Sequence, residues 1–394
     1  MEASHLIVLL LIGYIVFTID NHAKAFPQPP ILVLIGIGLS FIPFFSSMEL
    51  TQKTLYEFFL PALLFISAYK YPSAALRKHG GVIGLLSTGG LIVTVGLLGG
   101  AIYYLASPFL ALPFIGALII AAILAPTDPI SVTAILKQAS GDETIADIVE
   151  GESMINDGTS IVVFTTLVTI VSSGKDLSAL SVLGDFLLVS LGGIAIGLIF
   201  GWLVCKAVHY THHKEFQVML SIVLAYGNFF LAEALGVSGV LATVTAGIML
   251  SWEFTHTNKE DHYRESLDGF WDIVEPTLLS LVFLTIGIIA PKYLDIKHLL
   301  LAFLIFIGSL IIRYIVIQLS LFTLPSTKKM GQSDALLISF AGVKGTMSVV
   351  LLLILETVND ENIQFYISVS FIAILLSLII QSFGIYPLTK KLSK

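Results

Sequence analysis

Long apolar runs follow one another along almost the whole chain, and short polar breaks separate them. A helix that spans a membrane needs about 20 mostly apolar residues. Proline, glycine and charged residues mark where each run stops. We therefore predict an all-α polytopic membrane protein with about 13 transmembrane helices. The predicted spans are, approximately, 5–20, 31–45, 55–70, 82–106, 113–138, 145–172, 180–208, 216–233, 237–253, 268–290, 298–324, 333–357 and 363–388.

The basic residues support an odd number of spans, because the loops on the cytoplasmic side of membrane proteins carry an excess of lysine and arginine. With the C-terminus in the cytoplasm, fourteen of the 20 basic residues fall on the cytoplasmic side and four on the other. Arg313 and Lys344 alone lie inside spans. We therefore predict a multi-pass protein of the cell (plasma) membrane, with the N-terminus outside and the C-terminus cytoplasmic. The fourteen are Lys24, Lys70, Arg77, Lys78, Lys137, Lys206, Lys214, Lys259, Arg264, Lys328, Lys329, Lys390, Lys391 and Lys394, and the four are Lys53, Lys175, Lys292 and Lys297.

Composition narrows the class further. The chain is 56% hydrophobic and 12% charged, with a mean hydropathy of +0.95, which lies outside the range of soluble domains. We expect residues 1–394 to form one membrane domain in the lipid bilayer, with no soluble regulatory domain and no nucleic-acid partner. The single cysteine, Cys205, excludes an internal disulfide and a cysteine-based metal cluster. We expect no cofactor.

Two of the predicted spans carry internal breaks. Pro126 and Pro129 interrupt the fifth span, because each removes a backbone donor. Gly342 and Gly345 flank Lys344 in the twelfth span and loosen the helix there. These two spans are seven apart, an odd offset that inverts topology, and interrupted helices in two inverted halves mark the substrate site of secondary transporters. The alternative is ordinary proline and glycine kinking, which is common in membrane helices.

Polar residues gather in the sixth span, in the stretch "EGESMINDGTSIVVF". Ser153 and Asp157 are four positions apart and share a helix face, whereas Glu152 and Asp157 diverge by about 140°. An ionised aspartate in the bilayer costs on the order of 3 kcal/mol or more, so it must face water, bind a cation or become protonated. We predict that Asp157 binds either a small cation or a proton. Ser153 and Thr127 would supply neutral oxygens, which alkali cations prefer, and Asn156 would fix the local geometry. The alternative is that Asp157 pairs with a basic residue.

The two basic residues inside the spans have other candidate partners. Arg313 stays charged and needs a permanent carboxylate, and Glu152, facing away from Asp157, is the natural partner. We predict that this pair is structural. Lys344 has three candidate roles: neutralising the C-terminal end of a half-helix, pairing with Asp128, or competing for Asp157 as a substitute cation.

Four motifs in order resemble one known family. The stretches "FFLPALLFISAY", "APTDPISVTAIL", "GESMINDGTSIVVF" and "AGVKGTMSVVLLL" are similar to those of the monovalent cation:proton antiporter-1 (CPA1) family, the NhaP and NHE type of sodium/proton antiporter. The resemblance covers essentially the whole chain. It implies two inverted six-helix repeats, crossed discontinuous helices 5 and 12, and a homodimer. It also implies electroneutral exchange of one cation for one proton by an elevator-like movement of a core domain.

The resemblance also implies roles for individual residues. The family's asparagine–aspartate pair falls on Asn156 and Asp157. Its ligand set matches Thr127, Asp128 and Ser153, and its structural pair matches Glu152 and Arg313. Two positions depart from the family pattern: an acidic residue is usual where Ile66 stands, and arginine is usual at Lys344. We expect a dimerisation part at about 1–80 and 180–290, and a core part at about 81–179 and 291–394.

Sequence reasoning keeps several functions open. We favour exchange of Na⁺, and also Li⁺, for H⁺, with Na⁺ held at Asp157, Ser153 and Thr127. A K⁺/H⁺ antiporter of the same fold is the nearest alternative, because oxygen ligands do not by themselves set cation size. A cation channel fits less well, since the chain lacks a TVGYG-like filter loop. An enzyme is disfavoured, because the spans hold no nucleophile with a base and no histidine set for a metal.

Overall fold

The computed structural model is a helical bundle in all the parts of the chain that it describes. These are residues 3–23, 27–45, 48, 50–108, 110, 112–128, 132–140, 143–173, 179–208, 210, 213–256, 261–324 and 330–392. The α-helices are α1 (Ala3–Ala23), α2 (Gln28–Leu39), α3 (Leu60–Lys70), α4 (Ser73–Leu85), α5 (Leu91–Ala106), α6 (Phe114–Ile123), α7 (Thr133–Ser140), α8 (Glu143–Ser173), α9 (Ala179–Val208), α10 (Lys214–Ile222), α11 (Asn228–Ala234), α12 (Gly239–His256), α13 (Asp261–Tyr293), α14 (Leu299–Thr323), α15 (Gln332–Ala341), α16 (Thr346–Leu355) and α17 (Ile363–Leu392). The 3-10 segments are η1 (Pro43–Phe45) and η5 (Ile296–His298), and the π-helical segments are η2 (Thr54–Phe59), η3 (Leu86–Gly90) and η4 (Val223–Gly227).

Every predicted apolar run contains helix in the structure. By length and composition, seven helices of the described chain can cross a membrane, or eight if α15 and α16 form one broken span. Shorter apolar helices lie within α1, α2, α6 and α12. The chain is therefore an all-helical membrane protein, and the number of thirteen spans stays a prediction.

The fourth predicted span begins earlier in the structure than the sequence suggested. We expected a start near residue 82, but α4, η3 and α5 run without a break from Ser73 to Ala106. Pro72 is the N-cap of this helix and has an extended backbone, so the helix begins directly after it. Arg77 and Lys78 are exposed, so the first turns carry charge on an outer face rather than forming a loop. The prediction of a loop at Arg77 and Lys78, beside Gly80 and Gly81, was therefore wrong, because these residues lie within α4.

The two predicted breaks meet in space. Helix α6 ends at Ile123, the chain up to Asp128 is not helical, and α7 begins at Thr133; Pro129, part of the predicted break, lies outside the described residues. Helices α15 and α16 are bent by 50° at a gap that holds Lys344. The backbone N–H of Asp128 donates a hydrogen bond of 2.7 Å to the carbonyl oxygen of Val343. The interrupted fifth and twelfth spans therefore cross at their breaks.

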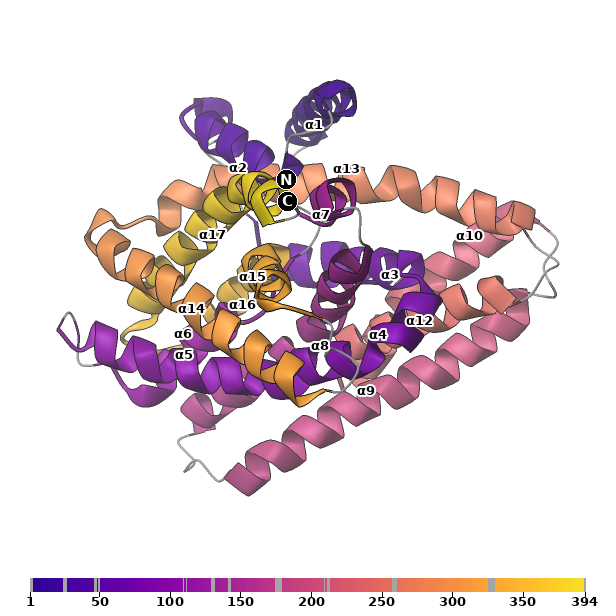
Figure 1. Ribbon diagram of the computed structural model, residues 1–394. Helices are drawn as coiled ribbons and strands as arrows, with labels where there is room; N and C mark the ends of the chain where they lie inside the picture. The colour runs from indigo at the N-terminus through magenta and orange to yellow at the C-terminus, as the bar shows by residue number, and fades with distance from the viewer. Residues whose placement is uncertain are drawn as a thin grey trace.

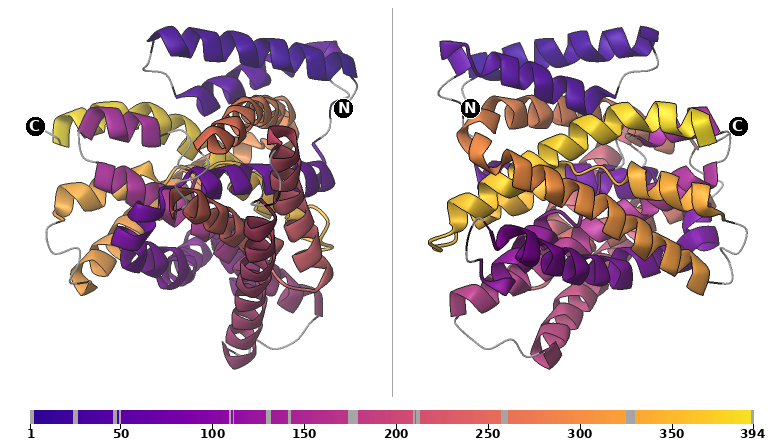
Figure 2. Two further views of the ribbon diagram at one scale, coloured as in Figure 1. Left: turned by 90° about the vertical axis from the view of Figure 1, so that its right-hand side faces the viewer. Right: turned by 60° about the vertical axis from the view of Figure 1, so that its left-hand side comes forward.

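Helices surround this crossing (Figure 1), and we distinguish two groups among them by their contacts, although the groups also touch through α13 and α17. Helix α13 contacts α2, α1, α3 and α10, and α12 contacts α9 and α3. On the opposite side, α5 contacts α6 and α14, and α14 contacts α17 and α15. Helices α8, α15 and α16 lie near the centre in Figure 1. Helix α1 begins at the end of the molecule opposite to that at which α17 ends (Figure 2).

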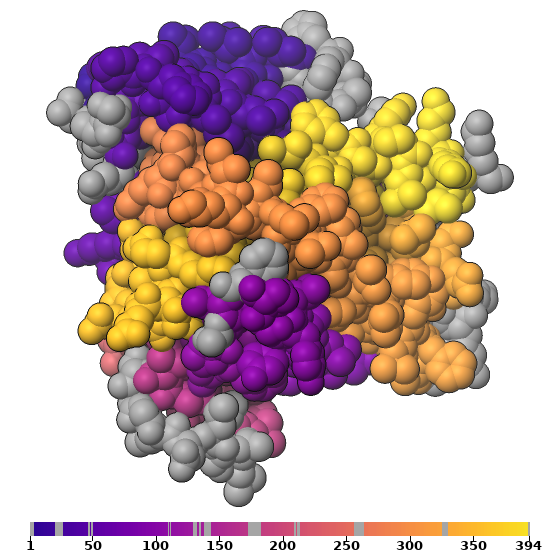
Figure 3. All heavy atoms as spheres, turned by 90° about the vertical axis from the view of Figure 1, so that its left-hand side faces the viewer, coloured from indigo at the N-terminus to yellow at the C-terminus, as the bar shows by residue number. Residues whose placement is uncertain are grey.

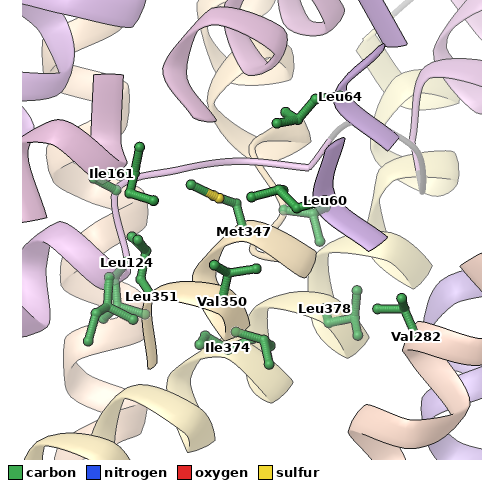
Figure 4. Close-up of a cluster of buried hydrophobic side chains, with 14 of the residues drawn as sticks. Leu60, Leu64, Leu124, Ile161, Val282, Met347, Val350, Leu351, Ile374 and Leu378 are labelled. Carbon is green, nitrogen blue, oxygen red and sulfur yellow. The ribbon is translucent and has the colours of Figure 1, made fainter. Parts of the chain in front are cut away.

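Buried apolar side chains fill the space between the two groups (Figure 4). Met347 and Val350 of α16 are buried, and Met347 lies beside Leu60 of α3 (Figure 4). Leu378 of α17 points toward Val282 of α13 in the same view. Because lipid tails are as apolar as these side chains, close packing rather than exclusion of water holds such helices together.

Candidate ion-binding site

The break in the fifth span is fastened to α8 by two side chains. The hydroxyl of Ser153 donates a hydrogen bond to the carbonyl oxygen of Thr127. The Nδ2 atom of Asn156 donates to the hydroxyl oxygen of Thr127 over 2.9 Å. All three residues are buried. Both hydrogen bonds are accepted by Thr127, which lies in the non-helical break. Polar groups that lose their helical partners at the break therefore find partners on α8.

The Oδ1 atom of Asp157 is buried without a hydrogen-bond partner, as is that of Asn156, but only the Asp157 oxygen belongs to a carboxyl group that can carry a charge. The residue as a whole is partly exposed, and it lies one helical turn beyond Ser153 on the same face. Asp128 is near enough to act on it electrostatically. An ionised carboxylate inside a membrane is costly unless a cation or a proton compensates it. Asp157 therefore presents an open oxygen ligand beside the crossing.

Asp128 lies at the N-terminal end of α16. Its Oδ2 atom accepts hydrogen bonds from the backbone N–H and the hydroxyl of Thr346, at 3.2 and 3.3 Å. Free N–H groups and the helix dipole make a helix N-terminus favourable for a carboxylate. The charge of Asp128 is thus compensated by the other broken span. Thr346 was not among the predicted residues, although its position directly after Gly345 at the predicted break could have indicated it.

The close approach of Asp128 to α16 depends on Gly345, because a Cβ atom at this position would overlap the Asp128 carboxylate. We expect Gly345→Ala to displace that carboxylate from the helix end, and to lower both the melting temperature in detergent and the transport rate. Gly308→Ala on α14 is the matched control, since a Cβ there meets nothing within 4 Å. A Gly345→Ala protein that melts and transports like the control would contradict this role.

Lys344 lies in the gap between α15 and α16 and contacts the chain that follows α6. Its Nζ atom donates to the carbonyl oxygen of Ala125, just beyond the C-terminal end of α6, over 3.4 Å. A cation is favourable at a helix C-terminus, so this contact corresponds to the first of the three roles considered for Lys344. Its backbone N–H donates to Ser377, which in turn bonds Gln381. Sequence reasoning missed these two polar residues, although they are four positions apart in an apolar helix.

Glu152 and Arg313 form a buried ion pair. The NH1 and NH2 atoms of Arg313 donate to the two carboxylate oxygens of Glu152, each over 2.8 Å. This paired geometry is the strongest that the two side chains can form. Both residues, together with Asn156, line a cavity of about 10 Å³, which is room for roughly one water molecule.

Ile66, where the family pattern has an acidic residue, is a buried apolar residue of α3. No group of three or more His, Cys, Asp and Glu side chains that could hold a metal ion occurs in the part of the chain that the structure describes. The side-chain oxygens of Asp157, Ser153, Thr127 and Asp128 and the carbonyl groups of the two breaks lie near the crossing.

A helical bundle whose two broken helices cross beside a buried carboxylate has the architecture of a secondary transporter. The chain belongs to the family described as "Sodium/hydrogen exchanger, transmembrane", whose model matches residues 7–391. This is the CPA1 family that the motifs indicated. Its members are transporters rather than enzymes, and they need no cofactor, because the ions they carry are substrates.

Individual relatives cover most of the chain. The Na⁺/H⁺ antiporter NhaP of Pseudomonas aeruginosa is 30% identical over 349 residues, 86% of this chain and 81% of the relative. The Na⁺/H⁺ antiporter NhaH of Halobacillus aidingensis is 30% identical over an alignment of 408 residues, which covers 98% of this chain and 97% of the relative. The structure of the sodium proton antiporter MjNhaP1 of Methanocaldococcus jannaschii at pH 8 superposes with a TM-score of 0.79. It is 20% identical and covers 99% of this chain and 98% of that one. This last comparison establishes the fold.

Proposed function

We propose that the protein exchanges Na⁺, and also Li⁺, for H⁺ across the cell membrane, with Asp157 as the shared carboxylate. The observation that carries this proposal is the unpartnered Oδ1 atom of Asp157. Other charges at the crossing have partners: Glu152 has Arg313, Asp128 has the start of α16, and Lys344 has the carbonyl of Ala125. A cation or a proton would compensate Asp157 in turn. The names of the NhaP and NhaH relatives support sodium as the cation.

The proposed stoichiometry follows from this division of charge. Because Glu152 is already paired with Arg313, only Asp157 changes its occupant during the cycle. The site has the same net charge whether it holds one Na⁺ or one H⁺, so exchange of one for one is electroneutral. Ser153 and Thr127 would complete the Na⁺ shell with neutral oxygens, Asp128 would add a charged oxygen nearby, and Asn156 would hold Thr127 in place.

Alternating access would arise from movement between the two helix groups. We propose the core part at about 81–179 and 291–394 and the dimerisation part at about 1–80 and 180–290, in a homodimer. The apolar contact between α3 and α16 would close the path on one side of the site (Figure 4). The bias of lysine and arginine supports the proposal that the N-terminus lies outside and the C-terminus in the cytoplasm. Two contacts near the span ends fit this alternation: the Tyr71 hydroxyl donates to the backbone carbonyl oxygen of Asp147, and Lys292 donates to Glu356, with each pair on one predicted side.

Proteoliposomes test this function directly. With a pH-sensitive dye inside, we expect Na⁺ and Li⁺ to drive proton movement while K⁺ gives little signal. Valinomycin with K⁺ on both sides should leave the rate unchanged, because an electroneutral cycle moves no net charge. A response to K⁺ alone would favour the K⁺/H⁺ antiporter. A rate that follows an imposed membrane potential without a coupled proton flux would favour a cation channel.

A further inference from the structure

Glu356 is held by two donors at the end of α16. Lys292 Nζ donates to its Oε1 atom over 2.8 Å, and the hydroxyl of Tyr293 donates to its Oε2 atom over 2.9 Å. Tyr293 is buried, at 6% exposure, whereas the side chain of Lys292 is 62% exposed. The hydrogen bond from Tyr293 is thus the better shielded of the two, and the ion pair is open to solvent.

The two donors and the acceptor belong to different helices: α13 lies almost entirely within the proposed dimerisation part and passes its approximate bound at residue 290 only with its last turn, whereas α16 lies in the proposed core part. Lys292 and Tyr293 are the last residues of α13, and the first half of that helix is bound to α3, where Lys70 pairs with Asp272 and Glu275. Helix α16 continues from the crossing and contacts α17, α6 and α8, and it also contacts α13. The contact at Glu356 therefore joins the α13 group to the broken helix whose start is held by Asp128.

A cavity of about 660 Å³ lies beside this contact. Its walls come from the end of α2 and the chain that follows it, from the end of α13, and from the end of α16. Its apolar lining includes Phe41, Phe45 and Leu353, and Lys292 and Glu356 are among its polar lining residues. In Figure 3 the orange end of α13 and the golden end of α16 lie side by side at the left edge.

We propose that Lys292, Tyr293 and Glu356 form a latch between the two groups, which must open once in every transport cycle. If α16 moves with the core relative to α13, the two donors cannot stay within hydrogen-bond distance of Glu356. The latch then stabilises the state seen in the structure, and it lies on the side predicted to face outside. This inference rests on the proposed alternating access. Since nothing in the latch contacts Asp157, it affects the balance between states rather than ion binding itself.

Cross-linking tests whether the latch must open. Cys205 is the only cysteine, so Cys205→Ser gives a background without thiols. In that background we introduce Lys292→Cys with Glu356→Cys, and join the thiols with a short bifunctional methanethiosulfonate. We expect Na⁺/H⁺ exchange to fall to the background of empty liposomes and to return on reduction. The matched control is Lys53→Cys with Glu57→Cys, an exposed pair one turn apart on one helix, whose cross-link should leave the rate unchanged.

Full exchange by the cross-linked Lys292/Glu356 pair would overturn the latch. The unmodified Cys205→Ser background separates this outcome from failure of the proposed function, which predicts that the background itself exchanges Na⁺ for H⁺. A background without exchange would remove the proposed function, and the latch with it.

Distance measurement provides a readout that does not depend on transport. Spin labels at positions 292 and 356 should give two distance populations in proteoliposomes. Labels at the neighbouring positions 294 and 358 leave the latch residues unchanged. With these labels, Tyr293→Phe should raise the population with the longer distance roughly 2- to 10-fold. This is the range expected when one shielded hydrogen bond to a charged group is lost. The charge reversal Lys292→Glu with Glu356→Lys should restore more of the short distance than Glu356→Lys alone. A single distance unaffected by any of these changes would contradict the proposal.

Discussion

Asp157→Asn is expected to reduce Na⁺/H⁺ exchange to the background of protein-free liposomes. Asparagine keeps the size of the side chain but removes both the negative charge and the exchangeable proton. The remaining oxygens of Ser153 and Thr127 are neutral, and both already take part in hydrogen bonds with one another or with Asn156. They cannot replace a carboxylate as the group that alternates between cation and proton. Dequenching of a pH-sensitive dye after addition of Na⁺ measures the loss.

The same variant should assemble normally, because the Oδ1 atom of Asp157 makes no hydrogen bond that the substitution could break. Its melting temperature in detergent is expected to equal or exceed that of the unmodified protein, since a buried charge is removed. Asp185→Asn on the exposed side of α9 makes the same chemical change away from the crossing and should leave exchange intact. Full exchange by Asp157→Asn would sink the assignment of the shared carboxylate.

Glu152→Gln is expected to destabilise the protein rather than alter its ion affinity. The change leaves the guanidinium of Arg313 charged and buried without its carboxylate partner. Loss of one partner from a buried ion pair costs about 3–5 kcal/mol. We expect a melting temperature in detergent that is lower by several degrees and a smaller yield of assembled protein. Thermal unfolding followed by size-exclusion fluorescence provides the measurement.

Two controls separate a structural pair from an ion ligand. The double variant Glu152→Leu with Arg313→Met removes both charges and should recover much of the stability that Glu152→Gln loses, because apolar replacement of a whole buried pair is often neutral or better. Glu57→Gln, which disturbs an exposed pair with Lys53, should have little effect on stability. A well-assembled Glu152→Gln protein with altered Na⁺ affinity would place Glu152 among the ion ligands instead.

The sequence predicted those features that depend on local chemistry. Pro126 and the glycines around Lys344 indicated where the fifth and twelfth spans stop being helical, and the structure has both breaks there. Helical spacing placed Ser153 and Asp157 on one face. The need of a buried arginine for a carboxylate indicated Glu152 as the partner of Arg313, and the two are joined in the structure.

Features that depend on how distant segments of the chain meet could not be predicted from the sequence. The contact of Asp128 with Thr346 joins residues 218 positions apart and exists only because the two breaks cross. The choice among the three roles of Lys344 required the position of Ala125 on the other broken span. The contact of Lys292 and Tyr293 with Glu356 likewise depends on where α13 ends relative to α16. Periodicity within one helix contains none of this information.

Measuring proton release when Na⁺ binds tests most directly whether Na⁺ and H⁺ compete for Asp157. Purified protein in weak buffer receives Na⁺ while the pH and the amount of bound Na⁺ are followed. We predict release that approaches one proton per bound Na⁺ on the acid side of the titration. The apparent dissociation constant for Na⁺ should then rise by about tenfold for each unit decrease in pH, as expected when a ligand must lose a proton to bind. Asp157→Asn should release none, and Asp185→Asn should behave like the unmodified protein. Na⁺ binding with an affinity independent of pH, and without proton release, would contradict competition at a single carboxylate.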